Sequence, residues 1–362
     1  PKAPAREGAP NHPRCRRGAV GARRPGSATT SEDMAERFFV TGALGCLGSW
    51  VIHRLVQEGT EVVAGDVADG KDRWRLLDPR LEREVELVRC DVADVDGLER
   101  VLADRGVTHV VHLAALQVPF ARAQPLLGAR VNVEGMAAVL EAARRRRDQV
   151  RGVAFASSIA VFGPPSLYGE GPVANGAPAA PSTLYGAYKQ CDEWMSRVYE
   201  ADHGVSSIGL RPATVYGPAR DQGVTSSPSR AMLAAAAGRP FRIEWGGHSG
   251  YAFVDDVAAA FVAAARACAD GAGSETYNLP AVPAAMEEVV AAVVEVAPEA
   301  ALEFEPTQLP FPFDFDASAL RVRLTGLPET SLGDGVTRTV EMFRTAIAEG
   351  RVDVDRVLGP AR

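Results

Sequence analysis

The sequence predicts an α/β fold, in which a doubly wound parallel sheet is followed by a smaller C-terminal α/β part. From residue 37 onward, short apolar runs alternate with stretches of helical spacing. The runs are apolar throughout rather than alternately apolar and polar, which is typical of parallel strands covered by helices on both faces. Near residue 219 the composition changes to Pro- and Gly-rich loops and Ala-rich helices, and this change predicts the smaller part.

The first strand, helix and second strand show this alternation most clearly. "RFFVTG" at 37–42 is an apolar run that ends at a glycine, and "SWVIHRLVQEG" at 49–59 has helical spacing and a terminal glycine. "TEVVAGDV" at 60–67 is a second apolar run. Further apolar runs predict strands at 84–92, 107–116, 150–158 and 206–217, and helical spacing predicts helices at about 94–105, 128–147 and 182–203.

The C-terminal part contains further helical stretches near 228–238, 255–269, 284–297 and 333–349. We expect a sheet domain over 36–218, completed by strand and helix contributions from later residues. A second domain over 219–350 would cap the carboxyl ends of the strands and form the ligand-specific walls. Residues 351–362 would be a C-terminal tail.

Residues 1–35 are rich in Pro, Gly, Ala and Arg and show no hydrophobic periodicity. This composition predicts a disordered N-terminal extension. The segment has no apolar core for a secretory signal, and its prolines and glycines would break the helix of a transit peptide. Because Met34 stands just before the first strand, the segment could be a tag or an upstream extension, and we exclude it from the fold.

The composition excludes several classes of function. The 362 residues are 46% hydrophobic and 23% charged, and a net charge of −7 argues against a nucleic-acid surface. The five cysteines and six histidines are dispersed, so neither a disulfide framework nor a metal site is predicted. No run of about 18 apolar residues is present, so no membrane span is predicted. Free thiols fit a reducing compartment, and we expect a cytoplasmic protein.

The turn between the first strand and helix reads "TGALGCLG", with glycines at positions 42, 45 and 48. This spacing lets the backbone turn tightly and approach a diphosphate at the amino end of the helix. Asp66 ends the next strand, where a carboxylate can accept hydrogen bonds from an adenosine ribose. The arrangement predicts a dinucleotide site, and a merely tight turn with an exposed aspartate is the alternative.

The stretch "LYGAYKQ" at 184–190 places Tyr185 and Lys189 one helical turn apart on the same face. An ammonium about 5 Å from a phenol oxygen favours the phenolate by roughly 3 kcal/mol at an effective dielectric near 20. Such a tyrosine could exchange protons near neutral pH. Taken alone, the spacing also fits an amphipathic helix with a buried Tyr and a solvated Lys.

The chain resembles the extended short-chain dehydrogenase/reductases, the NAD-dependent epimerase/dehydratase family, because nine short motifs occur in the order in which that family has them. The resemblance covers 37 to about 350 and implies a Rossmann-type domain that binds NAD. The motifs are "TGALGCLG" at 41, "GD" at 65, "CDV" at 90, "HLAA" at 112, Asn132, "ASSIAVFG" at 156, "YGAYK" at 185, "RPATVYGP" at 211 and "FVDDVA" at 253.

The resemblance also implies roles for single residues. Ser158, Tyr185 and Lys189 would form the catalytic set, with Tyr185 as acid and base, Lys189 on the nicotinamide ribose, and Ser158 holding the substrate oxygen. The cofactor-binding residues would be Gly42, Gly45, Cys46, Leu47, Gly48, Asp66, Asp91, Val92, Leu113, Ala114, Ala115 and Asn132, together with Tyr185 and Lys189.

Departures from the family pattern bear on the reaction and the substrate. Ile159 and Ala160 stand where the dehydratases of the family carry an acidic pair, which argues against dehydration. Thr214 and Ser249 stand near the positions of an Asn and an Arg that contact the nucleotide diphosphate in sugar-nucleotide epimerases. Substrate contacts are therefore expected from Ser158, Thr214, Arg220 and Arg230, the two arginines lying in "ARDQGVTSSPSR", which could equally be an ordinary loop.

The sequence thus predicts an NAD-dependent enzyme that oxidises or epimerises a carbinol carbon of a sugar-like small molecule. A sugar-nucleotide 4-epimerase proper and a non-catalytic dinucleotide-binding protein are the alternatives. The N-terminal extension is the only feature that favours a scaffold or interaction protein. A dinucleotide sensor would have no use for Ser158, Tyr185 and Lys189 together, so their presence argues against it. The helix at 182–203 resembles the one that pairs dimers in the family, so a homodimer is possible.

Overall fold

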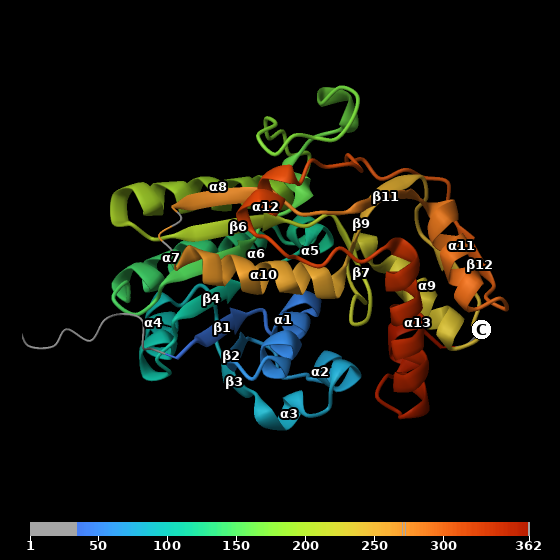
Figure 1. The fold of residues 1–362 in the computed structure, drawn as a ribbon, viewed down its shortest axis with the longest axis horizontal. Helices are drawn as coiled ribbons and strands as arrows, with labels where there is room; N and C mark the ends of the chain where they lie inside the picture. The colour runs from blue at the N-terminus through green and yellow to red at the C-terminus, as the bar shows by residue number, and fades with distance from the viewer. Residues whose placement is uncertain (1–34, 270, 272, 361–362) are drawn as a thin grey trace, which may run out of the picture. The chain divides into compact units, whose positions relative to one another are not determined.

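The computed structural model describes residues 35–269, 271 and 273–360. The expected disorder of residues 1–35 therefore lies almost wholly outside the described residues. The described residues from 36 onward cluster as one compact unit. Figure 1 shows the central sheet of this unit with helices α9, α11 and α13 side by side at its right, where α13 contacts both of the others.

Seven parallel strands form the main sheet of the described chain, in the order β10-β6-β5-β4-β1-β2-β3. This order reverses between β1 and β4, as in a doubly wound fold, and the predicted fold class is confirmed. The strands are β1 (Arg37–Thr41), β2 (Glu61–Asp66), β3 (Glu86–Arg89), β4 (His109–His112), β5 (Gly152–Ala156), β6 (Ser207–Arg211) and β10 (Ser274–Asn278).

Successive residues of β1 face two different cores. In β1, Phe38 and Val40 pack with α1 (Cys46–Gln57) and α10 (Val254–Cys268), whereas Phe39 packs with α4 (Val95–Asp104) and α7 (Gly135–Arg145) on the other face. Apolar side chains on both faces are the reason for the continuous apolar runs in the sequence. Because α10 and β10 complete the sheet layer, residues beyond 218 belong to it.

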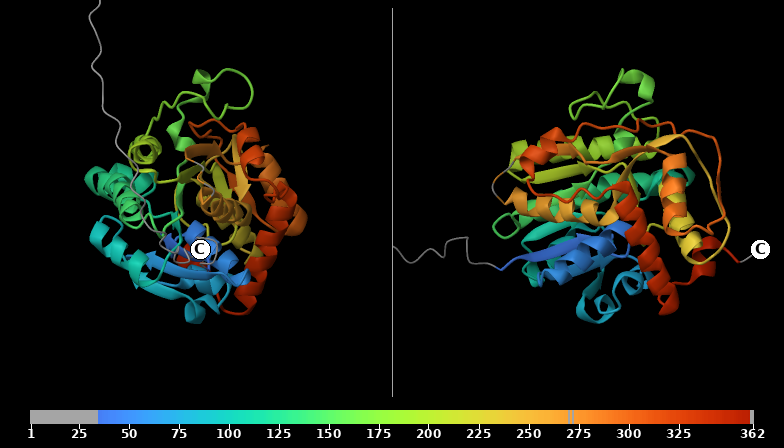
Figure 2. Two further views of the ribbon diagram at one scale, coloured as in Figure 1. Left: turned by 60° about the vertical axis from the view of Figure 1, so that its left-hand side comes forward. Right: turned by 45° about the vertical axis from the view of Figure 1, so that its right-hand side comes forward.

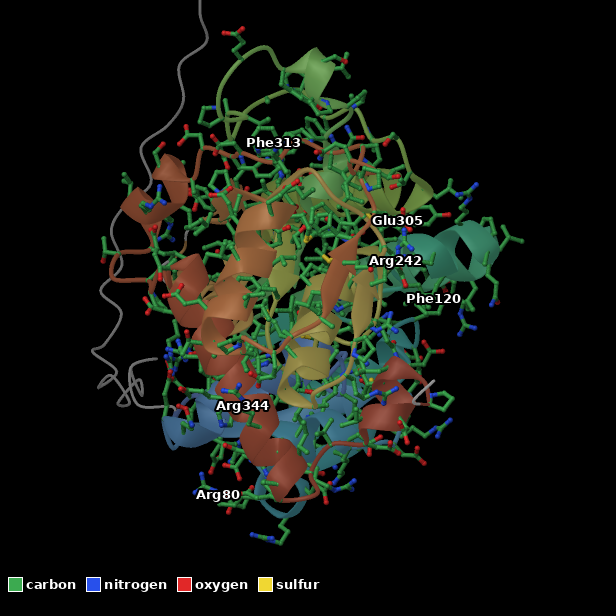
Figure 3. All side chains as sticks on the ribbon, turned by 90° about the vertical axis from the view of Figure 1, so that its right-hand side faces the viewer. Arg80, Phe120, Arg242, Glu305, Phe313 and Arg344 are labelled. Atoms are coloured by element: carbon green, nitrogen blue, oxygen red, sulfur yellow. The ribbon has the colours of Figure 1, made fainter. Side chains whose placement is uncertain are left out.

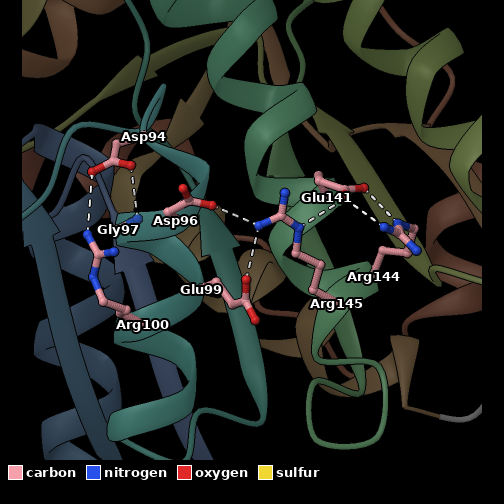
Figure 4. A network of polar contacts seen from close by, with 8 residues as sticks. All are labelled: Asp94, Asp96, Gly97, Glu99, Arg100, Glu141, Arg144 and Arg145. Carbon is pink, nitrogen blue, oxygen red and sulfur yellow. Dashed lines mark hydrogen bonds and ion pairs between the residues drawn. The ribbon is translucent and has the colours of Figure 1, made fainter.

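Helices α4 and α7 lie next to each other and are joined by an arginine at the surface. Arg145 of α7 contacts Asp96 and Glu99 of α4 at 2.9 and 3.1 Å and Glu141 of its own helix at 3.0 Å (Figure 4). Exposed pairs of this kind stabilise weakly one by one, and they fix the register of two helices that already share a core. Glu141 also pairs with Arg144.

The remaining helices of the sheet layer are short or irregular, except for α8. They are α2 (Asp72–Leu77), α3 (Leu81–Glu84), α5 (Val118–Ala123), α6 (Pro125–Ala129), the π-helical turn η1 (Arg130–Glu134), η2 (Ile159–Val161), η3 (Pro165–Leu167) and α8 (Leu184–His203). The helix predicted at 128–147 is therefore split among α6, η1 and α7. The segment 163–180, which carries η3, projects away from the sheet (Figure 2).

Two small sheets stand at the carboxyl side of the main sheet. One has the order β11-β9-β7 and the other pairs β12 with β8. They are built from β7 (Thr214–Tyr216), β8 (Phe241–Ile243), β9 (His248–Phe253), β11 (Val282–Ala285) and β12 (Leu302–Phe304). Arg242 on β8 forms an ion pair of 2.8 Å with Glu305, just after β12, and Figure 3 labels both side chains at the surface.

The helices around these small sheets complete the C-terminal part. They are η4 (Val224–Ser226), α9 (Ser227–Ala236), α11 (Met286–Val296), α12 (Ser318–Arg323), α13 (Leu332–Ala348) and α14 (Val354–Leu358). Helix α14 lies within the predicted tail and contacts α9. Within the described ranges, no helix combines the length and apolar character that crossing a membrane requires.

Candidate active site

A cleft of about 920 Å³ opens at the carboxyl ends of the strands and is lined by most of the predicted site residues. The glycine loop forms one wall. Gly42 has a φ of 65°, and a Cβ at this position would lie 2.7 Å from the Ala114 nitrogen. A Cβ on Gly48 would overlap the carbonyl oxygen of Gly42. Only glycines let the loop approach β4 and α1 this closely, which leaves the backbone at the amino end of α1 open to the cleft.

Cys46 and Leu47 begin α1 and line the same wall as Gly45. Burial raises the pKa of the Cys46 thiol to about 11, so the group stays protonated at neutral pH. A protonated thiol is a poor nucleophile. Cys46 therefore contributes packing and backbone to the cleft, and its side chain does not suggest covalent chemistry.

Asp66 lies at the end of β2 and is tied into the loop by its two carboxylate oxygens. Oδ2 accepts a hydrogen bond from the Leu44 nitrogen at 2.9 Å, and Oδ1 accepts one from the Ala68 nitrogen at 3.0 Å. Each oxygen keeps a further lone pair. The carboxylate lines the cleft and can accept bonds from two neighbouring hydroxyls, as on a ribose.

The carboxyl ends of β3 and β4 supply the floor beside this carboxylate. Asp91 and Val92 follow β3, and Asp91 pairs with Arg130 at 2.8 Å. The backbone after β4 is held by Thr41, whose carbonyl oxygen accepts from the Leu113 nitrogen at 3.2 Å. All the predicted floor residues line the cleft: Asp91, Val92, Leu113, Ala114 and Ala115.

Asn132 lies behind this floor, in the π-helical turn η1, and is fully buried. Its side-chain amide donates to the Leu116 carbonyl oxygen at 3.1 Å, and its Oδ1 accepts from the Leu116 nitrogen at 3.0 Å. The predicted cofactor residue Asn132 therefore does not line the cleft itself. It holds the backbone that follows Ala115.

Tyr185 and Ser158 both line the cleft, Tyr185 from the first turn of α8 and Ser158 from the segment that follows β5. Thr183 caps α8, with its Oγ1 accepting from the Gly186 nitrogen at 3.0 Å. A Cβ on Gly186 would overlap the Ala160 carbonyl oxygen, so the first turn of α8 packs directly on the segment that follows β5. This contact brings the phenol of Tyr185 and the hydroxyl of Ser158 into one cleft.

Lys189 lies beneath this pair rather than in the cleft wall. Its side chain is 1% exposed, and Nζ lies 5.9 Å from the centroid of the Tyr185 ring. Nζ also forms an ion pair of 3.2 Å with Asp192 Oδ2, and Asp192 is fully buried. Asp192 was not predicted as a site residue, although its i+3 spacing from Lys189 is visible in the sequence.

Burial shifts the protonation of two groups around Lys189. It raises the pKa of Asp192 to about 7, opposed by the nearby Lys189 ammonium. Burial and the same ammonium lower the pKa of His112 to about 3. His112 is therefore neutral at physiological pH, and its Nδ1 lies 2.7 Å from Thr41 Oγ1.

The C-terminal part forms the end of the cleft where substrate contacts are expected from the sequence. Thr214 on β7 and Ser249 on β9 line it, and their hydroxyl oxygens lie 2.7 Å apart. Arg220 also lines the cleft and donates from Nη2 to Thr225 Oγ1 at 3.0 Å. Its predecessor Ala219 has a φ of 70°, a strained conformation for a residue with a Cβ.

The loop that carries Arg220 is fixed to the glycine-loop side of the cleft. Trp50 of α1 donates from Nε1 to the Pro218 carbonyl oxygen at 2.9 Å. Asp221 pairs with Arg73 at 2.7 Å, and Arg73 also donates to the Leu44 carbonyl oxygen at 2.8 Å. The predicted cofactor wall and the predicted substrate loop are thus one connected structure.

Arg230 is not brought into this cleft. Its guanidinium lies 5.2 Å from the Phe241 ring centroid and 3.5 Å from Glu244, and it lines a smaller neighbouring cavity of about 30 Å³. Other cleft residues were not identified from sequence. They include Gln117, Gln222, Thr225, His248 and the segment 309–312, which is Pro-rich and carries no periodic signal.

Within the described residues, no group of three or more His, Cys, Asp and Glu side chains is arranged to hold a metal ion. The four cysteines in that part of the chain are free thiols. The polar groups of the cleft instead include a carboxylate at the end of β2, the Ser158 and Tyr185 hydroxyls, and the Arg220 guanidinium. This set suits a dinucleotide and a hydroxylated molecule bound side by side.

A family model and several known proteins match most of this chain. The model of the NAD dependent epimerase/dehydratase family matches residues 38–279. The UDP-glucose 4-epimerase of Mycolicibacterium smegmatis is 33% identical over 325 residues, which are 85% of this chain and 98% of that protein. The UDP-glucose 4-epimerase of Azospirillum brasilense is 34% identical over 182 residues, about half of either chain.

Solved structures agree with the fold. The UDP-glucose 4-epimerase of Thermus thermophilus in complex with NAD is 29% identical, with a TM-score of 0.70 over 86% of this chain and 99% of that one. The L-threonine dehydrogenase of Clostridium difficile has a TM-score of 0.77 over 88% of this chain and 99% of that one. At 20% identity, this second likeness shows the shared fold alone.

Proposed function

This chain belongs to the NAD-dependent epimerase/dehydratase family, and from that premise we propose that it catalyses reversible hydride transfer at a carbinol carbon of a sugar-like substrate, with Tyr185 as the acid and base. The observation that carries the proposal is the shared cleft of Ser158 and Tyr185, with the Lys189 ammonium 5.9 Å below the tyrosine ring. A dinucleotide-binding protein without catalysis would not need this set.

NAD is the cofactor of the family, and the residues present fit it. The glycine loop leaves room that a Cβ on Gly42 or Gly48 would fill, and Asp66 offers acceptor oxygens at the end of β2. Gly42, Gly45, Cys46, Leu47 and Gly48 would hold the diphosphate with their backbone. Asp66 would hold the adenosine ribose, and Asp91 and Val92 would flank the adenine. Bound NAD supplies the acceptor and donor of the hydride.

The protein side chains divide the remaining chemistry. Ser158 donates a hydrogen bond to the substrate oxygen and fixes its direction. Tyr185 removes the hydroxyl proton as hydride leaves the same carbon, and returns that proton in the reverse step. Lys189 stabilises the phenolate through its positive charge, and the family resemblance implies that its ammonium also bonds the cofactor ribose. Ile159 and Ala160 follow Ser158 in the cleft and cannot move protons, which argues against elimination of water.

We propose a free sugar derivative as the substrate rather than a nucleotide sugar. Thr214 and Ser249 offer neutral hydroxyls where the family's sugar-nucleotide epimerases place an Asn and an Arg. Arg220 lines the cleft, and its guanidinium would bind one carboxylate or phosphate of such a molecule. A sugar-nucleotide 4-epimerase is the second candidate, and its support is the 33% identity to such an enzyme over 98% of that enzyme's length.

One experiment tests both the cofactor and the reaction type. The purified protein is denatured, and the supernatant is assayed for released NAD. Tightly retained NAD supports an epimerase, which regenerates its cofactor in each turnover, whereas an empty site supports a net dehydrogenase. In either case Tyr185→Phe must abolish most of the turnover for the proposed chemistry to hold.

We also propose a homodimer formed through α8. Trp194 and Val198 on α8 are 58% and 54% exposed, and Leu126 on the adjacent α6 is 88% exposed. Exposed apolar side chains on neighbouring helices are typical of a surface that another subunit covers. Light scattering behind size-exclusion chromatography should give twice the chain mass, and Trp194→Glu should give the monomer mass.

A further inference from the structure

The Lys189 ammonium has a buried acidic partner that the proposed chemistry does not use. Asp192 lies one turn further along α8, and its Oδ2 is 3.2 Å from Lys189 Nζ. The two side chains are 0% and 1% exposed. The other carboxyl oxygen of Asp192, Oδ1, has no hydrogen-bond partner among the described residues. An acid held so far from water is costly, and its place beside the buried ammonium of the site calls for a functional reason.

Asp192 is the counter-ion of Lys189, because the other ionisable groups nearby are paired with other residues or are neutral. Glu193, the next acid on α8, is engaged by Arg211 of β6 in two bonds of 2.7 Å. His112 of β4 faces Lys189 and is neutral, and its Nε2 has no partner in the described part of the chain.

The charged side chains on the other elements that pack against α8 are exposed or paired elsewhere. These are Arg122 on α5, Arg130 and Glu134 on η1, Glu141, Arg144 and Arg145 on α7, and Glu275 on β10, which pairs with Arg323. The groups that act on Asp192 are therefore Lys189, which favours its ionised form, and Glu193, which opposes it.

We propose that Asp192 is a positioning residue of this site, which holds the Lys189 ammonium and sets how much of its charge acts on the Tyr185 phenol. The inference rests on the proposed function of Tyr185 as acid and base. When the Asp192 carboxyl is ionised, it offsets the ammonium and weakens the preference for the phenolate. When the carboxyl is protonated, the ammonium acts alone.

The protonation of Asp192 changes within the range where the enzyme would work. Burial raises the pKa of Asp192 to about 7, so both forms are present near neutral pH. As pH rises, Asp192 loses its proton, and its negative charge then offsets more of the Lys189 ammonium charge. The pH profile of turnover would report this change.

The variant Asp192→Asn tests the inference through the pH profile of kcat in the oxidative direction. Removing the negative charge favours the phenolate, so the acid limb of the profile should move to lower pH by about one unit. Asp202→Asn makes the same substitution at an exposed position of α8 and should leave the profile in place. If Asp192→Asn lowers turnover by the same factor at every pH and the profile does not move along the pH axis, Asp192 is merely structural and the inference is wrong.

A second measurement needs no substrate. Infrared difference spectra of the wild type between about pH 6 and about pH 8.5 should show a protonated carboxyl band that disappears as Asp192 ionises near its pKa of about 7. The band should be missing in Asp192→Asn, or in the smaller Asp192→Ser if the first variant does not fold. A wild type without such a band contradicts the inference. Near-normal turnover of Tyr185→Phe would instead refute the proposed function and leave the infrared result standing.

Discussion

The hydroxyl oxygens of Thr214 and Ser249 lie 2.7 Å apart on the neighbouring strands β7 and β9. Both side chains are buried, at 4% and 7% exposure, and both line the cleft. Because each hydroxyl already has the other as a partner, the pair presents a neutral surface. Such a surface suits sugar hydroxyls better than two negatively charged phosphates, whose strongest partners are arginines.

The first prediction concerns nucleotide diphosphates. Calorimetry with UDP, dTDP, GDP and CDP should give dissociation constants no tighter than about 1 mM, because the bidentate contact of an arginine is missing at Ser249. Micromolar binding of any one of them, lost in Arg220→Ala, would show that Arg220 supplies that contact and would restore the sugar-nucleotide interpretation. Ser249→Arg serves as the converse variant and should strengthen binding.

The second prediction concerns the proton. Tyr185→Phe should lower turnover by roughly two to four orders of magnitude, the range for a lost general acid and base, while the NAD dissociation constant changes by about twofold at most. Tyr188→Phe is the matched control, because Tyr188 lies on the same helix and its hydroxyl donates to the Pro125 carbonyl oxygen outside the cleft. A Phe variant at 185 with near-normal turnover would end the acid and base assignment.

Local patterns predicted the sheet and the position of the glycine loop because strand periodicity and glycine spacing are properties of short segments. The apolar runs predicted every strand of the central sheet up to β6, and the glycine loop lies where its motif predicted. The run 206–217 was expected as one strand and is two, β6 and β7, in different sheets. Pro212 stands between them, and a proline has no backbone N–H to continue the ladder.

Features that depend on distant packing were not predictable in this way. Arg230 shares a loop-like stretch with Arg220, yet the start of α9 turns it toward Phe241 and away from the cleft. Asp192 resembles any polar position of an amphipathic helix, and only the packing of other elements against α8, η1 and α7 among them, makes it buried. Asn132 was expected at the cofactor and instead supports the Leu116 backbone through the π-helical turn.

The third prediction concerns cofactor choice. NAD should bind about 10- to 100-fold more tightly than NADP, because a 2′-phosphate would meet the Asp66 carboxylate. Arg73 also lines this region, but its guanidinium is engaged by Asp221 and by the Leu44 carbonyl oxygen. Fluorescence titration with both cofactors measures the ratio of the NADP and NAD dissociation constants, and Asp66→Asn should bring this ratio closer to one. Equal affinity of the wild type for the two would mean that Asp66 is not at the ribose.

The fourth prediction concerns stability. Glu193 and Arg211 are 5% and 6% exposed and joined by two bonds of 2.7 Å, so Glu193→Ala leaves a buried guanidinium without its negatively charged partner. The free energy of unfolding, measured in urea, should fall by about 3–5 kcal/mol. Glu305→Ala breaks the exposed pair with Arg242 shown in Figure 3 and should cost about 0–1 kcal/mol. If both variants lost the same unfolding free energy, the prediction that breaking the buried pair costs more than breaking the exposed pair would be wrong.

The last prediction follows from the direction of the Asp192 shift. Burial raises its pKa in the folded protein from 3.8 to about 7, so between about pH 4 and pH 7 the folded state binds more protons than the unfolded state. The Asp192 contribution to stability is therefore fully present below about pH 4 and is lost as pH rises through 7. His112, with its pKa lowered to about 3, acts in the opposite direction over much of this range, so the wild-type curve alone mixes the two effects.

Comparing the wild type with Asp192→Asn isolates the carboxyl, because His112 is common to both. The unfolding free energy of the variant relative to the wild type should increase from about pH 4 to about pH 7, by at most about 1.4 kcal/mol per pH unit, and stay constant above that range. Chemical denaturation at a series of pH values measures this difference. Parallel curves for the two proteins would show that Asp192 titrates alike in the folded and unfolded chain, and the buried Lys189–Asp192 pair would then have no role in the pH response.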